Sequence, residues 1–271
     1  MRVGLNIDPS RLTATLAAFP GIASCRVFGP AGKGIPTWTS PTVAALTAAG
    51  VTPWISFKDW AHDTTALAAV TTWLDTIPAT LSTAILTYHH EPEGDMIPAD
   101  YRARWVKLAG RVRAHPNASK IKLVPIHTLY PARHKVYDRF NPDWTTWTGV
   151  WQQWAPTDST GRYVGDWMGW DCYQEITATG YEDPAAFLRI PIGAAYQSGV
   201  PLAVPELGAV KVPTDTTGTG RATWIAACLA TLRASGTTAV NWWQSTGTNG
   251  LDYRLTDQPS AAAWRTGVAA I

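Results

Sequence analysis

The stretch Ala84-Ile-Leu-Thr-Tyr-His-His-Glu-Pro-Glu-Gly-Asp95 decides the fold class of this sequence. It begins with a short apolar, β-branched run, which predicts a buried strand. It ends in two histidines, two glutamates and an aspartate, which the interior of a strand does not tolerate without partners. Acidic and imidazole groups at the C-terminal end of a buried strand are typical of the active site of a barrel or an open α/β enzyme.

Seven other strand-like runs occur in the chain, and nearly all of the eight are followed by a helical pattern. These runs are Val3–Ile7, Cys25–Phe28, Val51–Phe57, Ile121–Ile126, a segment within Tyr163–Tyr173, Leu202–Val204 and Thr238–Trp243. Eight strands in 271 residues give about 34 residues per unit, close to the roughly 31 of a typical barrel of this kind. The alternation predicts a parallel sheet that is buried on both faces. We therefore expect an α/β fold, a single (β/α)8 TIM barrel that forms one domain over residues 1–271.

An open, doubly wound sheet is the alternative fold. It is disfavoured because no glycine-rich phosphate loop follows the first strand, and because reactive side chains follow almost every strand rather than one switch point. The longest connection, 128–162, is rich in aromatic residues, and we expect a helix within it, near Trp144 to Trp154.

Composition excludes several classes of partner. The net charge is +2, only 15% of residues are charged, and lysine and arginine form no run, so we expect neither nucleic acid nor an anionic membrane as a partner. No signal segment precedes the first strand, and no apolar run is long enough to span a membrane. We expect a cytoplasmic or phage-particle-associated protein, or an excised extracellular module; the sequence does not indicate its oligomeric state.

Tryptophan is unusually frequent, with 15 residues. Most of them are expected in the core, but a tryptophan at a strand end offers the flat apolar face on which the C–H side of a sugar ring stacks. A second acid like those of the opening stretch lies in Pro201-Leu-Ala-Val-Pro-Glu206-Leu-Gly-Ala209. Acetal hydrolysis needs one carboxylic acid and one carboxylate, and Glu91 and Glu206 end two non-adjacent strands. The strand ends bring candidate residues to one rim: Asp8, Arg26, Asp59, His90, Glu91, His127, Asp171, Tyr173, Glu206 and Trp243.

The arrangement resembles the clan of (β/α)8 retaining glycosidases that carry the acid/base at the end of strand four and the nucleophile at the end of strand seven. Within that clan it is most similar to the β-mannanase-like, family 26-type enzymes, in which a histidine precedes the acid/base. The matching residues are His90-Glu91, Gly169-Trp-Asp171-Cys-Tyr173, Pro205-Glu206-Leu-Gly208-Ala209, Trp242-Trp243 and Arg26. After the acid/base, however, such enzymes usually continue with Asn-Gly and a tryptophan, where this chain has Pro92-Glu93-Gly94-Asp95, so the substrate is left open.

The resemblance implies an endo-acting retaining hydrolase of a polysaccharide or oligosaccharide that needs no cofactor and no metal. Glu91 would be the general acid/base and Glu206 the nucleophile. Tyr173 and Arg26 would keep Glu206 ionised, and an apolar setting would raise the pKa of Glu91. The expected substrate-binding residues are Arg26, Asp59, His90, His127, Asp171, Tyr173, Trp242 and Trp243.

Three alternatives are left open. Glu93 is the rival of Glu91 as the acid/base, disfavoured about three to one because His90 precedes Glu91. A metal-dependent barrel hydrolase is suggested by His89-His90-Glu91 and His127, although strand one lacks the H-x-H pair usual in such barrels. The third is a non-catalytic carbohydrate-binding barrel, or a receptor-binding module such as that of a phage tail.

Overall fold

The apolar runs of the sequence form a sheet of parallel strands. The structure is a computed structural model, and it describes residues 1–30, 33–58, 64–94, 96–134, 151–175, 180–247 and 250–270. The strands are β1 (Arg2–Ile7), β2 (Ser24–Phe28), β3 (Thr52–Phe57), β4 (Ala84–Tyr88), β5 (Ile121–Leu123), β6 (Ile126–Thr128), β7 (Met168–Tyr173), β8 (Leu202–Gly208) and β9 (Ala239–Gln244). Their side chains are almost all buried, as expected for a sheet covered on both faces.

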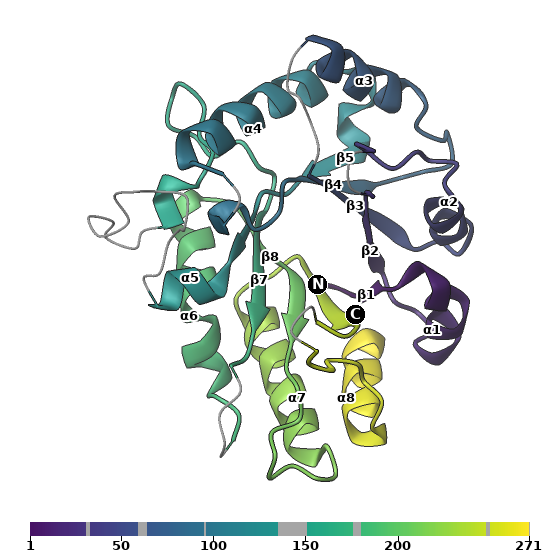
Figure 1. Ribbon diagram of the computed structural model, residues 1–271, viewed down its shortest axis with the longest axis vertical. Helices are drawn as coiled ribbons and strands as arrows, with labels where there is room; N and C mark the ends of the chain where they lie inside the picture. Colours follow the sequence, from purple (N-terminus) through teal and green to yellow (C-terminus); the bar gives the residue numbers. More distant parts are fainter. Residues whose placement is uncertain are drawn as a thin grey trace.

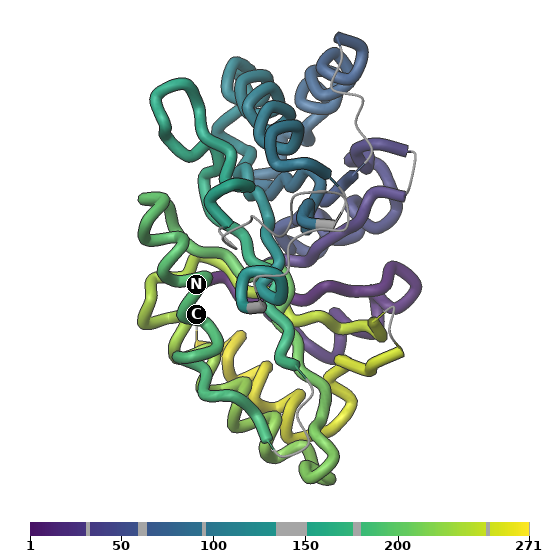
Figure 2. Tube along the Cα trace, turned by 60° about the vertical axis from the view of Figure 1, so that its left-hand side comes forward, coloured from purple at the N-terminus to yellow at the C-terminus, as the bar shows by residue number. Residues whose placement is uncertain are grey.

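The strand order is β5-β4-β3-β2-β1-β9-β8-β7-β6, so the first and last strands pair with each other and the sheet curls round. Figure 2 shows the two ends of the chain close together. The strands at the sheet ends, β5 and β6, are the two halves of one run, interrupted at Val124 and Pro125. Single hydrogen bonds continue the ladder there, from Val124 N to Leu86 O (3.0 Å) and from Gly169 N to Pro125 O (2.8 Å). The predicted unbroken strand Ile121–Ile126 is therefore wrong, because proline has no N–H to donate.

Helices follow the strands and surround the sheet (Figure 1). They are α1 (Leu12–Ala18), α2 (Pro41–Ala48), α3 (Thr64–Asp75), α4 (Pro98–Arg113), α5 (Leu129–His134), α6 (Pro184–Ser198), α7 (Thr219–Ala234) and α8 (Gln258–Ala269), with 3-10 turns at Pro9–Arg11, Pro92–Gly94, Pro116–Lys120 and Trp151–Gln153. With β5 and β6 counted as one strand, the fold is the predicted (β/α)8 barrel.

The connection after the fifth strand differs from the prediction. Helix α5 begins directly after β6, in a segment expected to be a loop. The helix predicted near Trp144 to Trp154 falls mostly on residues outside the described part of the chain, and Trp151–Gln153 forms a 3-10 turn.

The barrel interior is divided into an apolar and a polar layer. Its apolar side chains form a cluster separate from the larger core beneath the helices: Trp54, Ile85, Val124, Ile126, Trp167, Ala203 and Ala239. A polar chain crosses three neighbouring strands, from Ser24 Oγ to Asn241 Oδ1 (2.7 Å) and from Asn241 Nδ2 to Asn6 Oδ1 (3.2 Å). A Cβ at Gly4 would lie 2.1 Å from Ser24 O, so only glycine fits beside this chain.

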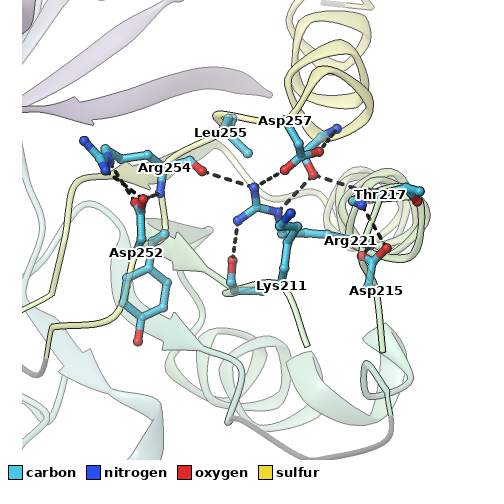
Figure 3. A network of polar contacts seen from close by, with 12 residues as sticks. Lys211, Asp215, Thr217, Arg221, Asp252, Arg254, Leu255 and Asp257 are labelled. Atoms are coloured by element: carbon cyan, nitrogen blue, oxygen red, sulfur yellow. Dashed lines mark hydrogen bonds and ion pairs between the residues drawn. The ribbon is translucent and has the colours of Figure 1, made fainter. Parts of the chain in front are cut away.

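A second polar network joins the loops that follow β8 and β9 (Figure 3). At its centre Arg221, in the first turn of α7, donates from Nε to Ser260 Oγ (2.9 Å), from Nη1 to Ala209 O (3.2 Å) and from Nη2 to Arg254 O (3.1 Å). Its Nη2 also pairs with the carboxylate of Asp257, which caps α8. The guanidinium thus holds both loops and the start of α8 at the C-terminal end of the barrel.

No helix in the described part of the chain is both long and apolar enough to cross a membrane.

Candidate active site

The carboxyl group of Glu91 is placed by an unusual turn at the end of β4. His89 and Glu91 have positive φ angles, 45° and 53°, which non-glycine residues rarely adopt. The turn is held from both sides, because His89 N donates to Phe57 O (2.7 Å) and Glu91 N donates to Ile126 O (3.2 Å). Strained backbone that its neighbours hold in place is concentrated at functional sites.

Glu206 is placed by an irregularity within β8. The pairing register with β9 shifts between Val204 and Leu207, where Pro205 supplies no N–H to the ladder. The carbonyl oxygen of Pro205 instead accepts from Asn6 Nδ2 (2.8 Å) across the barrel interior. An irregularity of this kind redirects a side chain, and Glu206 lies with its carboxyl group beside those of Glu91 and Asp171. One carboxylate oxygen from each of the three lies within 4.8 Å of the others.

Arg26 on β2 neutralises part of this negative charge. Its Nη1 donates to Glu206 Oε1 (2.7 Å) and pairs with Asp171 Oδ2 (3.2 Å), and its side chain is fully buried. The hydroxyl of Tyr173 donates to the other oxygen of Glu206. Two donors therefore hold Glu206, as the sequence predicted for these two residues.

Burial and mutual repulsion separate the acids. Burial, followed by the negative charge of Glu206, raises the pKa of Glu91 to about 7. Burial and the charge of Glu206 also raise the pKa of Asp171 well above its usual range. Burial raises the pKa of Glu206 too, but Arg26 and the hydrogen bond from Tyr173 oppose that rise. Since these hydrogen bonds go to Glu206, it is the member of the pair with Glu91 that ionises first.

His90 is uncharged and lies beside the acids. Burial, followed by the positive charges of Arg26 and Lys58, lowers its pKa well below the usual value. Its Nδ1 lies 3.1 Å from Ser56 Oγ, and its ring contacts the edge of Phe28, with ring centroids 5.4 Å apart.

The acids open into a cavity of about 530 Å³ at the C-terminal end of the barrel. Aromatic side chains from four different connections line much of it, and Tyr130 is 55% exposed at its edge. The described lining residues are Phe28, His90, Glu91, Thr128, Tyr130, Asp171, Tyr173, Gln174, Glu175, Glu206, Trp243, Gly247, Leu251 and Tyr253. The cavity thus combines acids at its base with flat apolar faces.

Two of the expected substrate-binding residues do not line this cavity. Trp242 is fully buried on the opposite side of β9 from Trp243, where its Nε1 donates to Tyr253 O (2.8 Å) and its ring packs on Trp264 of α8. His127 is also fully buried, with Nδ1 3.5 Å from Glu93 Oε1 and its ring against Trp170. Both placements follow from the alternation of side chains along a strand. Asp59 lies outside the described residues.

Glu93, the rival acid, is held behind the cavity wall. It is 4% exposed, and its carboxylate accepts from Thr128 N (3.1 Å) and Thr128 Oγ1 (3.3 Å). These contacts join the turn after β4 to the end of β6, and Glu93 is absent from the cavity lining, which includes Glu91.

Several lining residues were not expected from the sequence. Phe28 ends a predicted strand and had the same positional signal as Arg26, whereas Tyr253, Gln174 and Glu175 belong to connections whose course the sequence does not indicate. Ser56 and Lys58 lie at the end of β3. Lys58 contributes positive charge to Glu91 and Glu206.

The three carboxyl groups are the one set of potential metal ligands that the described residues bring together, and no histidine belongs to it. Arg26 already supplies a positive charge 2.7 Å from Glu206. The arrangement that suggested a metal hydrolase, with His90 and His127 as ligands, is not formed, because His90 bonds Ser56 and His127 lies beside Glu93.

Neither a protein-family model nor a curated protein matches the sequence. Solved structures do resemble the fold. A triple variant of an endo-β-1,4-glucanase from Xanthomonas axonopodis pv. citri is similar with a TM-score of 0.63 at 12% identity, covering 100% of this chain and 99% of that one. A fungal β-1,4-galactanase structure gives 0.61 at 14% identity (98% and 99% covered). A family GH128 endo-β-1,3-glucanase from Sorangium cellulosum gives 0.60 at 16% identity (98% of both chains). At these identities the likeness shows the shared barrel fold.

Proposed function

We propose that the protein is a retaining glycoside hydrolase that cleaves a polysaccharide, with Glu91 as the general acid/base and Glu206 as the nucleophile. The observation that carries the proposal is the approach of their carboxylate oxygens to within 4.8 Å. Retaining enzymes place the two carboxyl groups roughly 5–5.5 Å apart, whereas inverting enzymes need roughly 6.5–9.5 Å to admit a water molecule.

The electrostatics of the pair support these roles. An acid with a pKa of about 7 is still protonated in a large fraction of molecules near neutral pH, so Glu91 can donate a proton to the leaving oxygen. Arg26 and Tyr173 stabilise the charge on Glu206, which attacks the anomeric carbon. Formation of the glycosyl–enzyme bond removes the negative charge of Glu206. Since that charge helps to raise the pKa of Glu91, Glu91 then becomes the stronger acid and, as its carboxylate, can accept a proton from water.

The similar structures supply the substrates to try first. Their titles name an endo-β-1,4-glucanase, an endo-β-1,3-glucanase and a β-1,4-galactanase, and a further GH128 endo-β-1,3-glucanase from Amycolatopsis mediterranei was crystallised with laminaripentaose. The aromatic lining of the cavity, with Trp243 and Tyr130 at its base and edge, suits the apolar faces of sugar rings. We therefore propose endo action on a β-linked glucan, galactan or mannan.

Glu206→Gln and Glu91→Gln test the proposal on that panel, with released reducing ends as the measurement. We expect Glu206→Gln to lose at least roughly 10⁴-fold in kcat and Glu91→Gln roughly 10²–10⁴-fold, each with an unchanged far-UV circular dichroism spectrum. Glu93→Gln is the matched control and should retain most of the activity. Polysaccharide binding without release of reducing ends by the wild type would instead favour a non-catalytic binding barrel.

The anomeric configuration of the first product, followed by NMR, tests the retaining mechanism separately. We expect retention. A product of inverted configuration would contradict the role of Glu206 as nucleophile while leaving hydrolysis intact.

A further inference from the structure

Ser56 connects the arginine of the site to the histidine that lines the cavity. Arg26 Nη2 lies 3.2 Å from Ser56 Oγ, and Ser56 Oγ lies 3.1 Å from His90 Nδ1. Arg26 and Ser56 are fully buried. A guanidinium can only donate, so Ser56 Oγ is an acceptor toward Arg26.

The hydroxyl proton of Ser56 then needs an acceptor of its own. Within the described part of the chain, His90 Nδ1 is the only acceptor in contact with Ser56 Oγ. A buried hydroxyl proton without a partner costs free energy. Every donor and acceptor of this chain is satisfied when Arg26 donates to Ser56 and Ser56 donates to an unprotonated Nδ1.

We infer that Ser56 is a positioning residue that fixes the neutral imidazole of His90 in the Nε2–H tautomer. The second ring nitrogen is thereby a hydrogen-bond donor, and among the described residues it has no printed acceptor, while the ring itself lines the cavity. His90 offers the substrate an N–H and does not take a proton from it. The group it meets is an acceptor, a hydroxyl or ring oxygen of the sugar; this last step rests on the proposed function.

The same chain joins two functions of Arg26. One guanidinium nitrogen holds the carboxylate of Glu206, and the other fixes the hydrogen bond of Ser56. The charge state of the nucleophile and the donor presented by His90 are therefore set by one buried side chain. Arg26 and Lys58 also keep His90 uncharged, which the tautomer requires.

Long-range ¹H–¹⁵N NMR on histidine-labelled protein measures the tautomer directly, with the His90 signal assigned by its loss in His90→Gln. We expect the Nε2–H pattern at neutral pH in the wild type and in Ser56→Thr, which keeps the hydroxyl. Ser56→Ala should give the averaged pattern of exchanging tautomers. Ser24→Ala, which removes another buried hydroxyl from the barrel, should leave the His90 signal unchanged.

Activity gives the second measurement. Ser56→Ala should lower kcat/KM about tenfold, the effect of roughly one hydrogen bond, and Ser56→Thr should restore it to within about twofold. A wild-type His90 that is protonated or carries its proton on Nδ1 overturns the inference, and so does an unchanged tautomer in Ser56→Ala. The NMR result does not depend on turnover, so it is distinct from a failure of the Glu91 and Glu206 variants, which would overturn the hydrolase assignment.

Discussion

Arg26 and Arg221 are both almost completely buried, but their surroundings differ in charge. Arg221 meets one carboxylate, that of Asp257, and its other contacts are backbone carbonyls and the hydroxyl of Ser260 (Figure 3). Arg26 meets the carboxylates of Glu206 and Asp171, with Glu91 close to both, and its Nε has no hydrogen-bond partner among the described residues. The first network is balanced and satisfied, whereas the second holds more acid than one guanidinium can neutralise.

The carboxyl groups record this difference. Burial alone would raise the pKa of Asp257, but hydrogen bonds from Ser260 and the charge of Arg221 lower it below its usual value. Near Arg26, burial and the charge of Glu206 raise the pKa of Asp171 in spite of the same kind of partner. A single arginine therefore stabilises one ionised acid well and three close acids incompletely. The surplus acid is what makes a proton available near neutral pH.

The largest effect that distinguishes the two arginines is expected from Arg26→Lys. A lysine ammonium cannot contact Glu206, Asp171 and Ser56 with the fixed geometry of a guanidinium. We expect kcat/KM to fall roughly 10²–10³-fold, measured as reducing ends released from the best polysaccharide of the panel. A loss below about tenfold would mean that Tyr173 alone keeps Glu206 ionised.

Arg221→Lys is the matched substitution at the other arginine, and its expected effect is on stability. Lysine leaves some of the buried acceptors around position 221 without donors, at about 3 kcal/mol of unfolding free energy. For a chain of this size that lowers Tm by about 10 °C in a thermal scan. Below the transition, kcat/KM should stay within about twofold of the wild type. A loss of activity comparable to that of Arg26→Lys would break the proposed division between the two networks.

The pH dependence of Glu91 sharpens the same comparison, because only the network around Arg26 holds an acid with a pKa of about 7. We expect kcat/KM to fall as the pH rises through about 7, where Glu91 loses the proton it must donate. The folded state also binds this proton more tightly than the unfolded chain, whose pKa is near 4.5. The stability contributed is therefore full below about pH 4.5 and is lost as the pH rises to about 7.

Thermal scans of the wild type and Glu91→Gln across this range measure that loss. The difference in Tm between the two proteins should change over the interval and level off above it. A pH–rate profile that stays flat through pH 7 would contradict the assignment of Glu91 as the general acid.

The smallest effects are expected from the two adjacent tryptophans of β9. Trp243→Ala removes a ring that lines the cavity, and we expect a loss in kcat/KM of up to about tenfold, the size of one aromatic contact, with little change in Tm. Trp242→Phe removes a buried hydrogen bond to Tyr253 O and should cost about 1 kcal/mol of stability without raising KM. The reverse pattern would show that the side chains face the opposite way.

The sequence by itself determined the barrel and the strand ends that carry Glu91, Glu206, Arg26 and Tyr173. Apolar runs alternating with helical patterns require a parallel sheet, and a parallel sheet brings the C-terminal ends of all its strands to one rim. Residues far apart in the chain could therefore be assigned to one site without knowledge of their distances.

Only the tertiary structure decided which side chains at that rim meet. The period of two along a strand puts Trp242 and Trp243 on opposite faces, but which of them faces the cavity depends on how β9 is rotated in the barrel. The same holds for His127. The approach of Glu206 to Glu91 depends on an irregular strand at Pro205 and on positive φ angles at His89 and Glu91. Contacts from neighbouring strands hold this geometry, and no local sequence pattern encodes those contacts.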